Sequence, residues 1–270
     1  MESSGTNWTV DSVRSADGTT IAYETAGDGP PILLVGGAFN DRSTTRPLAA
    51  ALTADFTVYG YDRRGRGESG DTGPYAVQRE IEDLAALIDR AGPGAHLYGL
   101  SSGAILAAYA VAEGVPVSGL ALFEPPFQAG PHGGAKPGLA ERLSELVAAG
   151  RRDDAVALFL TDAVGVPAEA VGGMRGAPEW AWMVGLAHTL AYDTTVTGYA
   201  GLPADRLKSI AVPTVVLDST GSPPWLRDAA VATAGAIPGA THLSLAGGFH
   251  QVPPDVLAPA LRDTLLGRGR

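Results

Sequence analysis

The pentapeptide from Gly99 to Gly103, Gly-Leu-Ser-Ser-Gly, has the residue types and spacing of nucleophilic catalysis. A serine on a sharp turn between a strand and a helix has strained backbone angles, which lift its hydroxyl clear of a sheet. Glycines flank it because side chains there would collide with the neighbouring strand and helix. A helix that begins just behind Ser101 offers unpaired N–H groups and its positive dipole end to an oxyanion.

The residues around the pentapeptide supply the structural context that this chemistry needs. Residues 96–100 form a short apolar run typical of a buried strand, and the small and aliphatic residues from Ser102 to Leu106 favour a helix. Glycine and serine are abundant in loops, so the pentapeptide alone is a weak signal. The strand before it and the helix after it make Ser101 a candidate nucleophile.

The elements that position this turn alternate along the chain. Alternating strands and helices imply a parallel α/β sheet with right-handed crossovers. Continuous apolar runs such as Pro31–Val35 suit central strands covered on both faces. We predict strands at residues 8–13, 19–25, 31–35, 56–61, 96–100, 117–123, 213–217 and 241–245, and helices at 44–53, 75–90, from 102 onward, at 225–236 and at 254–266.

The alternation stops in the middle of the chain. Helical stretches at 139–149, 153–161 and 179–192 are separated by glycine and proline, without a convincing strand. We interpret residues 128–201 as a helical lid or cap inserted into an α/β core formed by residues 1–127 and 202–270.

Composition limits the class of protein. With 270 residues, 45% of them hydrophobic, the chain can bury a large core in one domain. It has no cysteine, which excludes a disulfide framework and thiol catalysis. A formal net charge of −10 argues against nucleic acid or an anionic membrane surface as a partner. Residues 1–5 lack the pattern of a signal peptide and there is no apolar run of about eighteen residues, so we expect a cytoplasmic protein without a membrane span.

Two further motifs accompany the pentapeptide. Tyr61–Ser69 reads Tyr-Asp-Arg-Arg-Gly-Arg-Gly-Glu-Ser, and Gly247–His250 comes late in the chain. In this order the three motifs resemble those of the α/β-hydrolase family, whose loop reads Asp-x-Arg-Gly-x-Gly-x-Ser. The resemblance covers nearly all of the chain. It implies an α/β-hydrolase fold, a mostly parallel central sheet flanked by helices with a helical lid, and it implies no cofactor. We find no metal-ligand spacing.

The resemblance also implies which histidine activates Ser101. A serine hydroxyl is a poor nucleophile at neutral pH and needs a base. In the family's chain order the base comes last, on the loop after the final strand. His250 stands there. We expect His242, inside the last strand, to point into packing or solvent, and His188 to lie in the lid.

The acid that orients the histidine has two candidates. In the common family pattern an Asp follows the penultimate strand by a few residues, but Ser222 stands at or near that position here. We favour Glu124, after the strand that follows the nucleophile helix, because its long side chain can reach across from the neighbouring strand. This placement resembles that of the zearalenone-lactone hydrolases. Asp218, at the strand tip, stays the alternative.

The oxyanion hole and the pocket complete the predicted site. The resemblance implies that the backbone N–H of Ser102 works with an N–H from the loop after Val35, where Ala38 is our first candidate and Gly37 the next. One predicted lid helix carries several large apolar side chains, which pack the lid on the core or line an apolar pocket. The predicted substrate-binding residues are Phe39, Phe127, Trp180, Met183 and Tyr192.

The arginines of the Tyr61–Ser69 loop admit two interpretations. Arg63, Arg64 and Arg66 could form an anion site. We favour a structural turn held by Asp62 and Ser69, because arginines are mostly solvated surface groups.

These patterns predict a serine hydrolase that cleaves a carboxylic ester or lactone of a small apolar molecule through an acyl-enzyme on Ser101. The same triad could serve C–C bond hydrolysis, perhydrolysis, or a cyclisation or acyl transfer, because function depends on the pocket rather than the fold. A ligand-binding, receptor-like protein with a degenerate triad is a third possibility, supported by the missing Asp near Ser222. The sequence leaves the oligomeric state open.

Overall fold

The computed structural model describes residues 7–129, 136–198 and 201–267, so the predicted features of residues 1–5 lie outside the described part. Within it, eight strands form one sheet in the order β1-β2-β4-β3-β5-β6-β7-β8. β2 runs antiparallel to both of its neighbours and the other pairs are parallel, as the mostly parallel sheet of the sequence analysis requires. The strands are β1 (Thr9–Arg14), β2 (Thr20–Ala26), β3 (Pro31–Val35), β4 (Thr57–Tyr61), β5 (His96–Leu100), β6 (Gly119–Phe123), β7 (Thr214–Ser219) and β8 (Thr241–Leu245).

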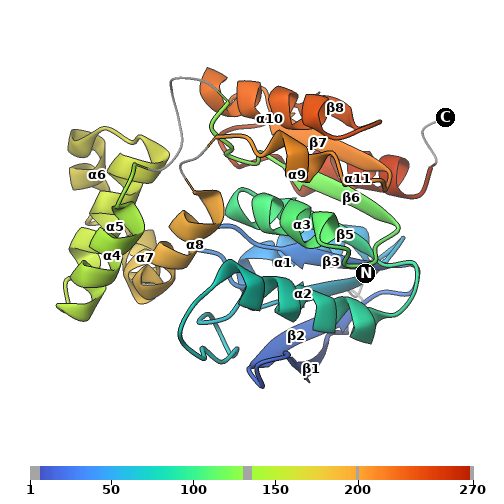
Figure 1. Ribbon diagram of the computed structural model, residues 1–270, viewed down its shortest axis with the longest axis horizontal. Coiled ribbons are helices and arrows are strands. Elements are labelled where there is room, and N and C mark those ends of the chain that lie inside the picture. The colour runs from blue at the N-terminus through green and yellow to red at the C-terminus, as the bar shows by residue number, and fades with distance from the viewer. Residues whose placement is uncertain (1–6, 130–135, 199–200, 268–270) are drawn as a thin grey trace, which may run out of the picture.

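Helices cover both faces of this sheet (Figure 1). α1 and α11 pack on one face, and α2, α3, α9 and α10 pack on the other. The bounds are α1 (Arg42–Leu52), α2 (Val77–Ala91), α3 (Ser102–Ala112), α9 (Ala204–Leu207), α10 (Pro224–Ala236) and α11 (Pro254–Leu265). The short α9 was not predicted, because four residues are too few to give a helical periodicity.

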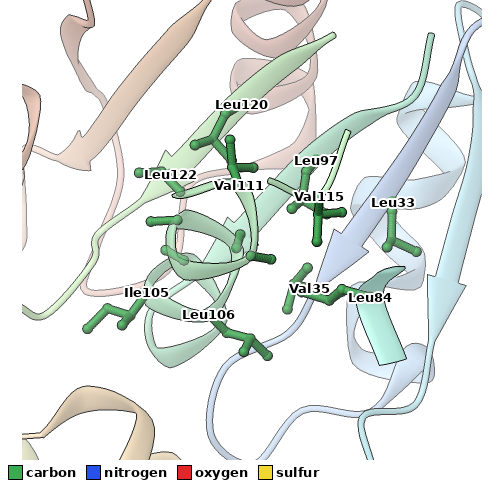
Figure 2. Close-up of a cluster of buried hydrophobic side chains, with 14 of the residues drawn as sticks. Leu33, Val35, Leu84, Leu97, Ile105, Leu106, Val111, Val115, Leu120 and Leu122 are labelled. Atoms are coloured by element: carbon green, nitrogen blue, oxygen red, sulfur yellow. The ribbon is translucent and has the colours of Figure 1, made fainter. Parts of the chain in front are cut away.

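The side chains of the central strands alternate between two hydrophobic clusters. In β6, Leu120 and Leu122 face the cluster under α3, whereas Ala121 and Phe123 face the cluster under α11. Each fully buried leucine stabilises the fold by about 1.5–3 kcal/mol relative to an exposed one. Figure 2 shows the first cluster, where side chains of β3, β5 and β6 meet those of α2 and α3.

The turn between β5 and α3 depends on two glycines. A Cβ atom on Gly99 would lie 2.4 Å from the carbonyl oxygen of Gly103, and a Cβ atom on Gly103 would lie 2.4 Å from that of Val35. Both distances are far below van der Waals contact, so only glycine fits. This close packing fixes the position of Ser101, whose φ is 56°.

Between β6 and β7 the described residues form helices and no strand. Those before α9 are α4 (Leu139–Ala148), α5 (Arg152–Phe159), α6 (Ala168–Met174), α7 (Pro178–Gly185) and α8 (Leu190–Thr197), called the inserted helices below. They have their own hydrophobic cluster. Figure 1 shows α4 to α7 grouped to one side of the sheet, with α8 between that group and α3. The predicted lid of residues 128–201 includes residues 130–135 and 199–200, which lie outside the described residues.

The prediction of one helix over residues 179–192 is wrong. α7 ends at Gly185, a 3₁₀ turn follows at Ala187–Thr189, and α8 begins at Leu190. Glycine has a low helix propensity and 3₁₀ turns are common where α-helices end, so the chain changes direction here. Sequence reasoning also missed α6, which contains the weak helix formers Gly172 and Gly173.

We predict that Gly99→Ala lowers the free energy of unfolding by about 1–3 kcal/mol, because the new methyl group overlaps the backbone of α3. Urea denaturation of the two proteins measures the difference. Gly235→Ala is the matched control, since a Cβ atom there meets no heavy atom within 4 Å. In a helix the control change should be neutral or stabilise by up to about 1 kcal/mol. Equal stabilities of the two variants would contradict the packing argument.

Candidate active site

Four non-glycine residues in the described part of the chain have a positive φ: Phe39, Ser101, Glu124 and His250. They follow β3, β5, β6 and β8, and parallel strands end at one edge of a sheet. Such backbone conformations cost on the order of 1–3 kcal/mol each and cluster at functional sites. The strained positions therefore mark the edge of the sheet at which the predicted residues Ser101, Glu124 and His250 lie.

The structure brings Glu124 and His250 together. Glu124 is fully buried, and its Oε2 lies 2.6 Å from Nδ1 of His250. The same oxygen accepts the backbone N–H of His250 at 3.1 Å. Because a carboxylate only accepts hydrogen bonds, Nδ1 carries the proton and Nε2 is left as the acceptor.

The second oxygen of Glu124 is held by β7 and the turn after it. Oε1 accepts the backbone N–H of Ser219 at 2.9 Å and the hydroxyl of Ser222 at 2.5 Å. Ser222 stands at or near the position where the common family pattern was expected to have Asp. The Ser222 hydroxyl donates to the Glu124 carboxylate, and it is this carboxylate that contacts His250.

The structure does not bring Asp218, the alternative acid, to His250. Its oxygens lie 2.6 Å from Nε2 of His242 and 3.4 Å from Nε of Arg227. Side chains alternate along a strand, so Asp218 shares the face of Val216 toward α10, which carries Arg227. His242, expected to point into packing or solvent, is part-buried and pairs with this buried carboxylate.

Ser101 is held at the turn by β6, since its backbone N–H donates to the carbonyl oxygen of Phe123 at 2.9 Å. Ser101 and His250 line one cavity. In the described part of the chain no hydrogen bond joins the two side chains. Catalytic hydrogen bonds are often long without substrate and shorten in the complex with it.

The loop after β3 borders the same cavity with backbone donors. The side chain of Asn40 accepts the N–H of Gly37 through Oδ1 at 2.9 Å, so Gly37 is already engaged. Within the described ranges the N–H groups of Ala38 and Ser102 have no hydrogen-bond partner. Both residues line the cavity. Two unpaired donors thus flank Ser101.

The cavity has a volume of about 410 Å³ and a largely apolar wall. Phe39 and Met183 line it, as predicted. Most other apolar lining residues were not predicted, among them Phe159, Leu160, Val164, Trp225 and Phe249. Trp225 follows a Pro-Pro pair and Phe249 precedes His250, and these neighbours were the available signals.

Three predicted pocket residues lie elsewhere. Phe127 is buried beside Tyr109 in the cluster under α3. Trp180 packs inside the inserted helices, and Tyr192 stacks on Tyr75 with ring centroids 3.9 Å apart. Because the chain changes direction after α7, Tyr192 does not lie on the same side as Met183 and does not line the cavity.

The arginines of the Tyr61–Ser69 loop are buried, which corrects the expectation of solvated side chains. Asp62 and Ser69 hold the turn as predicted, since Ser69 Oγ donates to the Asp62 carbonyl oxygen at 2.6 Å and Asp62 Oδ2 accepts the Glu68 N–H at 2.9 Å. Arg63 forms a two-pronged pair with Glu80, both bonds being 2.7 Å.

Asp193 on α8 joins this buried network and was not predicted. Its carboxylate contacts Arg63, Arg66 and the hydroxyl of Ser102. Burial alone would raise the pKa of the Asp193 carboxyl, but Arg66 and Arg63 beside it hold that pKa below its usual range. Asp193 is therefore ionised at neutral pH. No sequence motif marks this residue.

Comparison with known proteins identifies the class. Residues 32–260 match the model of the alpha/beta hydrolase family. The chain therefore belongs to the alpha/beta hydrolase family, as its motifs predicted, and it is an enzyme of the hydrolase type. No helix within the described ranges is long and apolar enough to cross a bilayer.

Two solved structures and one partial relative illustrate the similarity. An alpha/beta hydrolase from Sphaerobacter thermophilus is 49% identical over 94% of this chain and 99% of that chain, with a TM-score of 0.89. The enol-lactonase from Burkholderia xenovorans LB400 is 21% identical over 95% of this chain and 98% of that one, with a TM-score of 0.66, a likeness that shows the fold alone. The "Putative carbamate hydrolase RutD" of Azorhizobium caulinodans is 40% identical over 86 residues, which are 31% of this chain and 32% of the relative. The chain thus matches about a third of the length of the curated relatives.

We predict that Ser222→Ala lowers the free energy of unfolding by about 1.5–3 kcal/mol, since the buried Glu124 carboxylate loses a donor. Thr220→Ala, an exposed change in the same turn, should stay within about 0.5 kcal/mol of wild type. Urea titrations of both variants test this. Equal urea midpoints of unfolding for Ser222→Ala and Thr220→Ala would show that the Ser222 hydroxyl does not stabilise the buried carboxylate.

Proposed function

We propose that this hydrolase cleaves a carboxylic ester or lactone of a small, largely apolar molecule, with Ser101 as nucleophile, His250 as base and Glu124 as acid. The observation that carries the proposal is the 2.6 Å contact between Glu124 and His250 at a cavity that Ser101 also lines. A buried carboxylate on Nδ1 keeps Nε2 free to take a proton.

In the first half of the proposed reaction, Ser101 Oγ attacks the substrate carbonyl carbon and its proton passes to Nε2 of His250. Glu124 stabilises the imidazolium that forms. The tetrahedral intermediate places its negative oxygen near the unpaired N–H groups of Ala38 and Ser102. The intermediate collapses when His250 returns the proton to the leaving alcohol oxygen.

In the second half, water attacks the acyl group on Ser101 while His250 again takes the proton. The carboxylic acid leaves and Ser101 regains its hydroxyl. In a lactone the leaving alcohol stays attached to the acyl group, so one product forms instead of two. The narrower resemblance to the zearalenone-lactone hydrolases stays a prediction.

The cavity supports the choice of a small apolar substrate. Its volume of about 410 Å³ falls in the lower part of the usual range for ligand pockets, and aromatic and aliphatic side chains form much of its wall. We propose that residues 128–201 act as a lid, since Met183 from α7 and Phe159 from α5 help to close the cavity. We also propose that nucleic acids and membranes are not partners, in keeping with the net charge of −10.

Carbamate cleavage is a second candidate, which the name of the partial relative favours. The same steps would pass through a carbamoyl group on Ser101. C–C bond hydrolysis, perhydrolysis, and cyclisation or acyl transfer use the same three residues and stay as alternatives. The receptor-like alternative rested on the missing Asp near Ser222, and the Glu124 carboxylate beside His250 favours an enzyme instead.

We predict that Ser101→Ala lowers kcat for p-nitrophenyl butyrate by at least about a thousandfold, because no nucleophile remains. Glu124→Gln should lower kcat by about a thousandfold or more, since an amide on Nδ1 favours the wrong imidazole tautomer. Release of p-nitrophenol, measured for acetate, butyrate and octanoate esters and for a p-nitrophenyl carbamate, gives these rates and the acyl preference.

Asp218→Asn is the matched control, because Asp218 is an equally buried carboxylate that also contacts a histidine. Its kcat should stay within about threefold of wild type, since it does not touch His250. If Asp218→Asn abolishes turnover and Glu124→Gln does not, the assignment of the acid is wrong. If wild type cleaves neither esters nor carbamates, the cyclisation and acyl-transfer alternatives come first.

A further inference from the structure

Asp193 is a buried carboxylate that lines the same cavity as Ser101, yet the proposed reaction gives it no role. It comes from α8, outside the α/β core. Resting on the proposed function, we propose that Asp193 is a positioning residue that aims the two N–H donors of the oxyanion hole, through Arg66 and Ser102.

Arg66 carries the link from Asp193 to the first donor. Its Nη2 donates to Asp193 Oδ2 at 2.7 Å, and its Nη1 donates to the carbonyl oxygen of Gly37 at 2.5 Å and to that of Asn40 at 3.1 Å. In a trans peptide the C=O and the following N–H point in opposite directions. The Ala38 N–H therefore points away from Arg66. Holding the Gly37 oxygen thus fixes the direction of the Ala38 donor.

Ser102 carries the link to the second donor. Its hydroxyl donates to Asp193 Oδ1 at 2.7 Å, and its own N–H is the first of α3. The same carboxylate oxygen accepts Nη1 of Arg63 at 2.8 Å, which also donates to the Gly36 carbonyl oxygen at 3.2 Å. Asp193 is thus bonded to one donor residue directly and to the peptide of the other through a single arginine.

Each charged member of this network is needed to balance the buried charge of the others. Arg63 and Arg66 are almost fully buried, and the carboxylates of Asp193 and Glu80 balance them. A guanidinium can hold a carboxylate with one nitrogen and a carbonyl with another, which the single nitrogen of lysine cannot do in this geometry. Asp193→Asn removes the charge at nearly constant volume. It leaves Arg66 with a weaker partner, so Arg66 holds the Gly37 carbonyl oxygen less firmly and the Asn40 N–H, at 3.3 Å, becomes the main restraint on that peptide.

A purely structural role, in which Asp193 only anchors α8 to the core, makes a different prediction, and the chain offers a matched control. Asp83 on α2 is equally buried and accepts Nε and Nη2 of Arg64, both at 2.8 Å. Arg64 belongs to the same loop as Arg66, but its partners do not include residues 36–40. Asp83→Asn therefore breaks a similar buried pair without touching the proposed donors.

The experiment compares Asp193→Asn and Asp83→Asn with wild type in three measurements. They are kcat and KM for p-nitrophenyl butyrate, the melting temperature, and the dissociation constant of phenylboronic acid. Ser101 Oγ adds to the boron of this probe and its proton passes to His250. The boron becomes tetrahedral and places an oxygen where the oxyanion would lie, so its affinity reports on the hole independently of turnover.

We expect Asp193→Asn to lower kcat by about a hundredfold, the loss typical of one misplaced oxyanion donor. KM should change by less than about threefold, because the substrate is bound by the apolar wall. The affinity for phenylboronic acid should fall by about the same factor as kcat/KM. Asp83→Asn should lower the melting temperature but leave kcat and the boronic acid affinity within about twofold of wild type.

The proposal is overturned if Asp193→Asn keeps both kcat and boronic acid affinity at the level of Asp83→Asn, since a mere anchor would lose only stability. If Asp193→Asn does not fold, Arg66→Lys against Arg64→Lys makes the same comparison. Wild type that binds phenylboronic acid but cleaves no ester refutes the ester proposal, while the two dissociation constants still decide the role of Asp193. Wild type that does not bind the probe overturns the proposal for Asp193.

Discussion

The buried carboxylate of Glu124 is the interaction on which the geometry of the candidate site depends. An ionised carboxylate can be buried only if hydrogen bonds replace its water. Four donors do this here: two from His250, and one each from Ser219 and Ser222. The donors come from the ends of β7 and β8, and Glu124 itself follows the neighbouring strand β6. The parallel order of these strands is therefore what makes the pairing of Glu124 with His250 possible.

A second buried network, formed by Arg63, Arg66 and Asp193, contacts Ser102 and the loop after β3. Buried ion pairs are weak evidence for stability, because desolvation offsets much of their attraction. Their directional bonds do fix geometry, and here they end on the carbonyl oxygens of the loop after β3. Trp182, from α7, holds another carbonyl oxygen of that loop, that of Phe39, at 2.8 Å. The loop is thus bonded both to the core and to the inserted helices.

Much of the fold could be predicted from local signals. Apolar runs indicated the central strands because strands covered on both faces have mostly apolar positions, and Pro31–Val35 matches its predicted bounds. Glu124 could be named as a candidate because it directly follows such a run. The helix over residues 179–192 was wrong because its apolar residues continue past Gly185, where the helix ends. Pocket residues assigned from that single helix, such as Tyr192, were misplaced with it.

The buried network could not be predicted from the sequence. Arg63 and Asp193 are 130 residues apart, and α8 belongs to a segment without the alternation that places the strands. A run of arginines is on average solvated, and only the tertiary structure reveals the carboxylates that bury it. The same holds for Asp218, whose pairing with His242 depends on the register of β7 and β8.

The most direct test of the pairing between Glu124 and His250 is the rate at which a fluorophosphonate labels Ser101. Wild type, Glu124→Gln and Asp218→Asn are compared, and mass spectrometry of peptides locates the adduct. A serine activated by an oriented histidine reacts quickly. We expect wild type and Asp218→Asn to be labelled at Ser101 at equal rates, and Glu124→Gln at least about a hundredfold more slowly. Labelling of Glu124→Gln as fast as wild type would contradict the role of this carboxylate in the site.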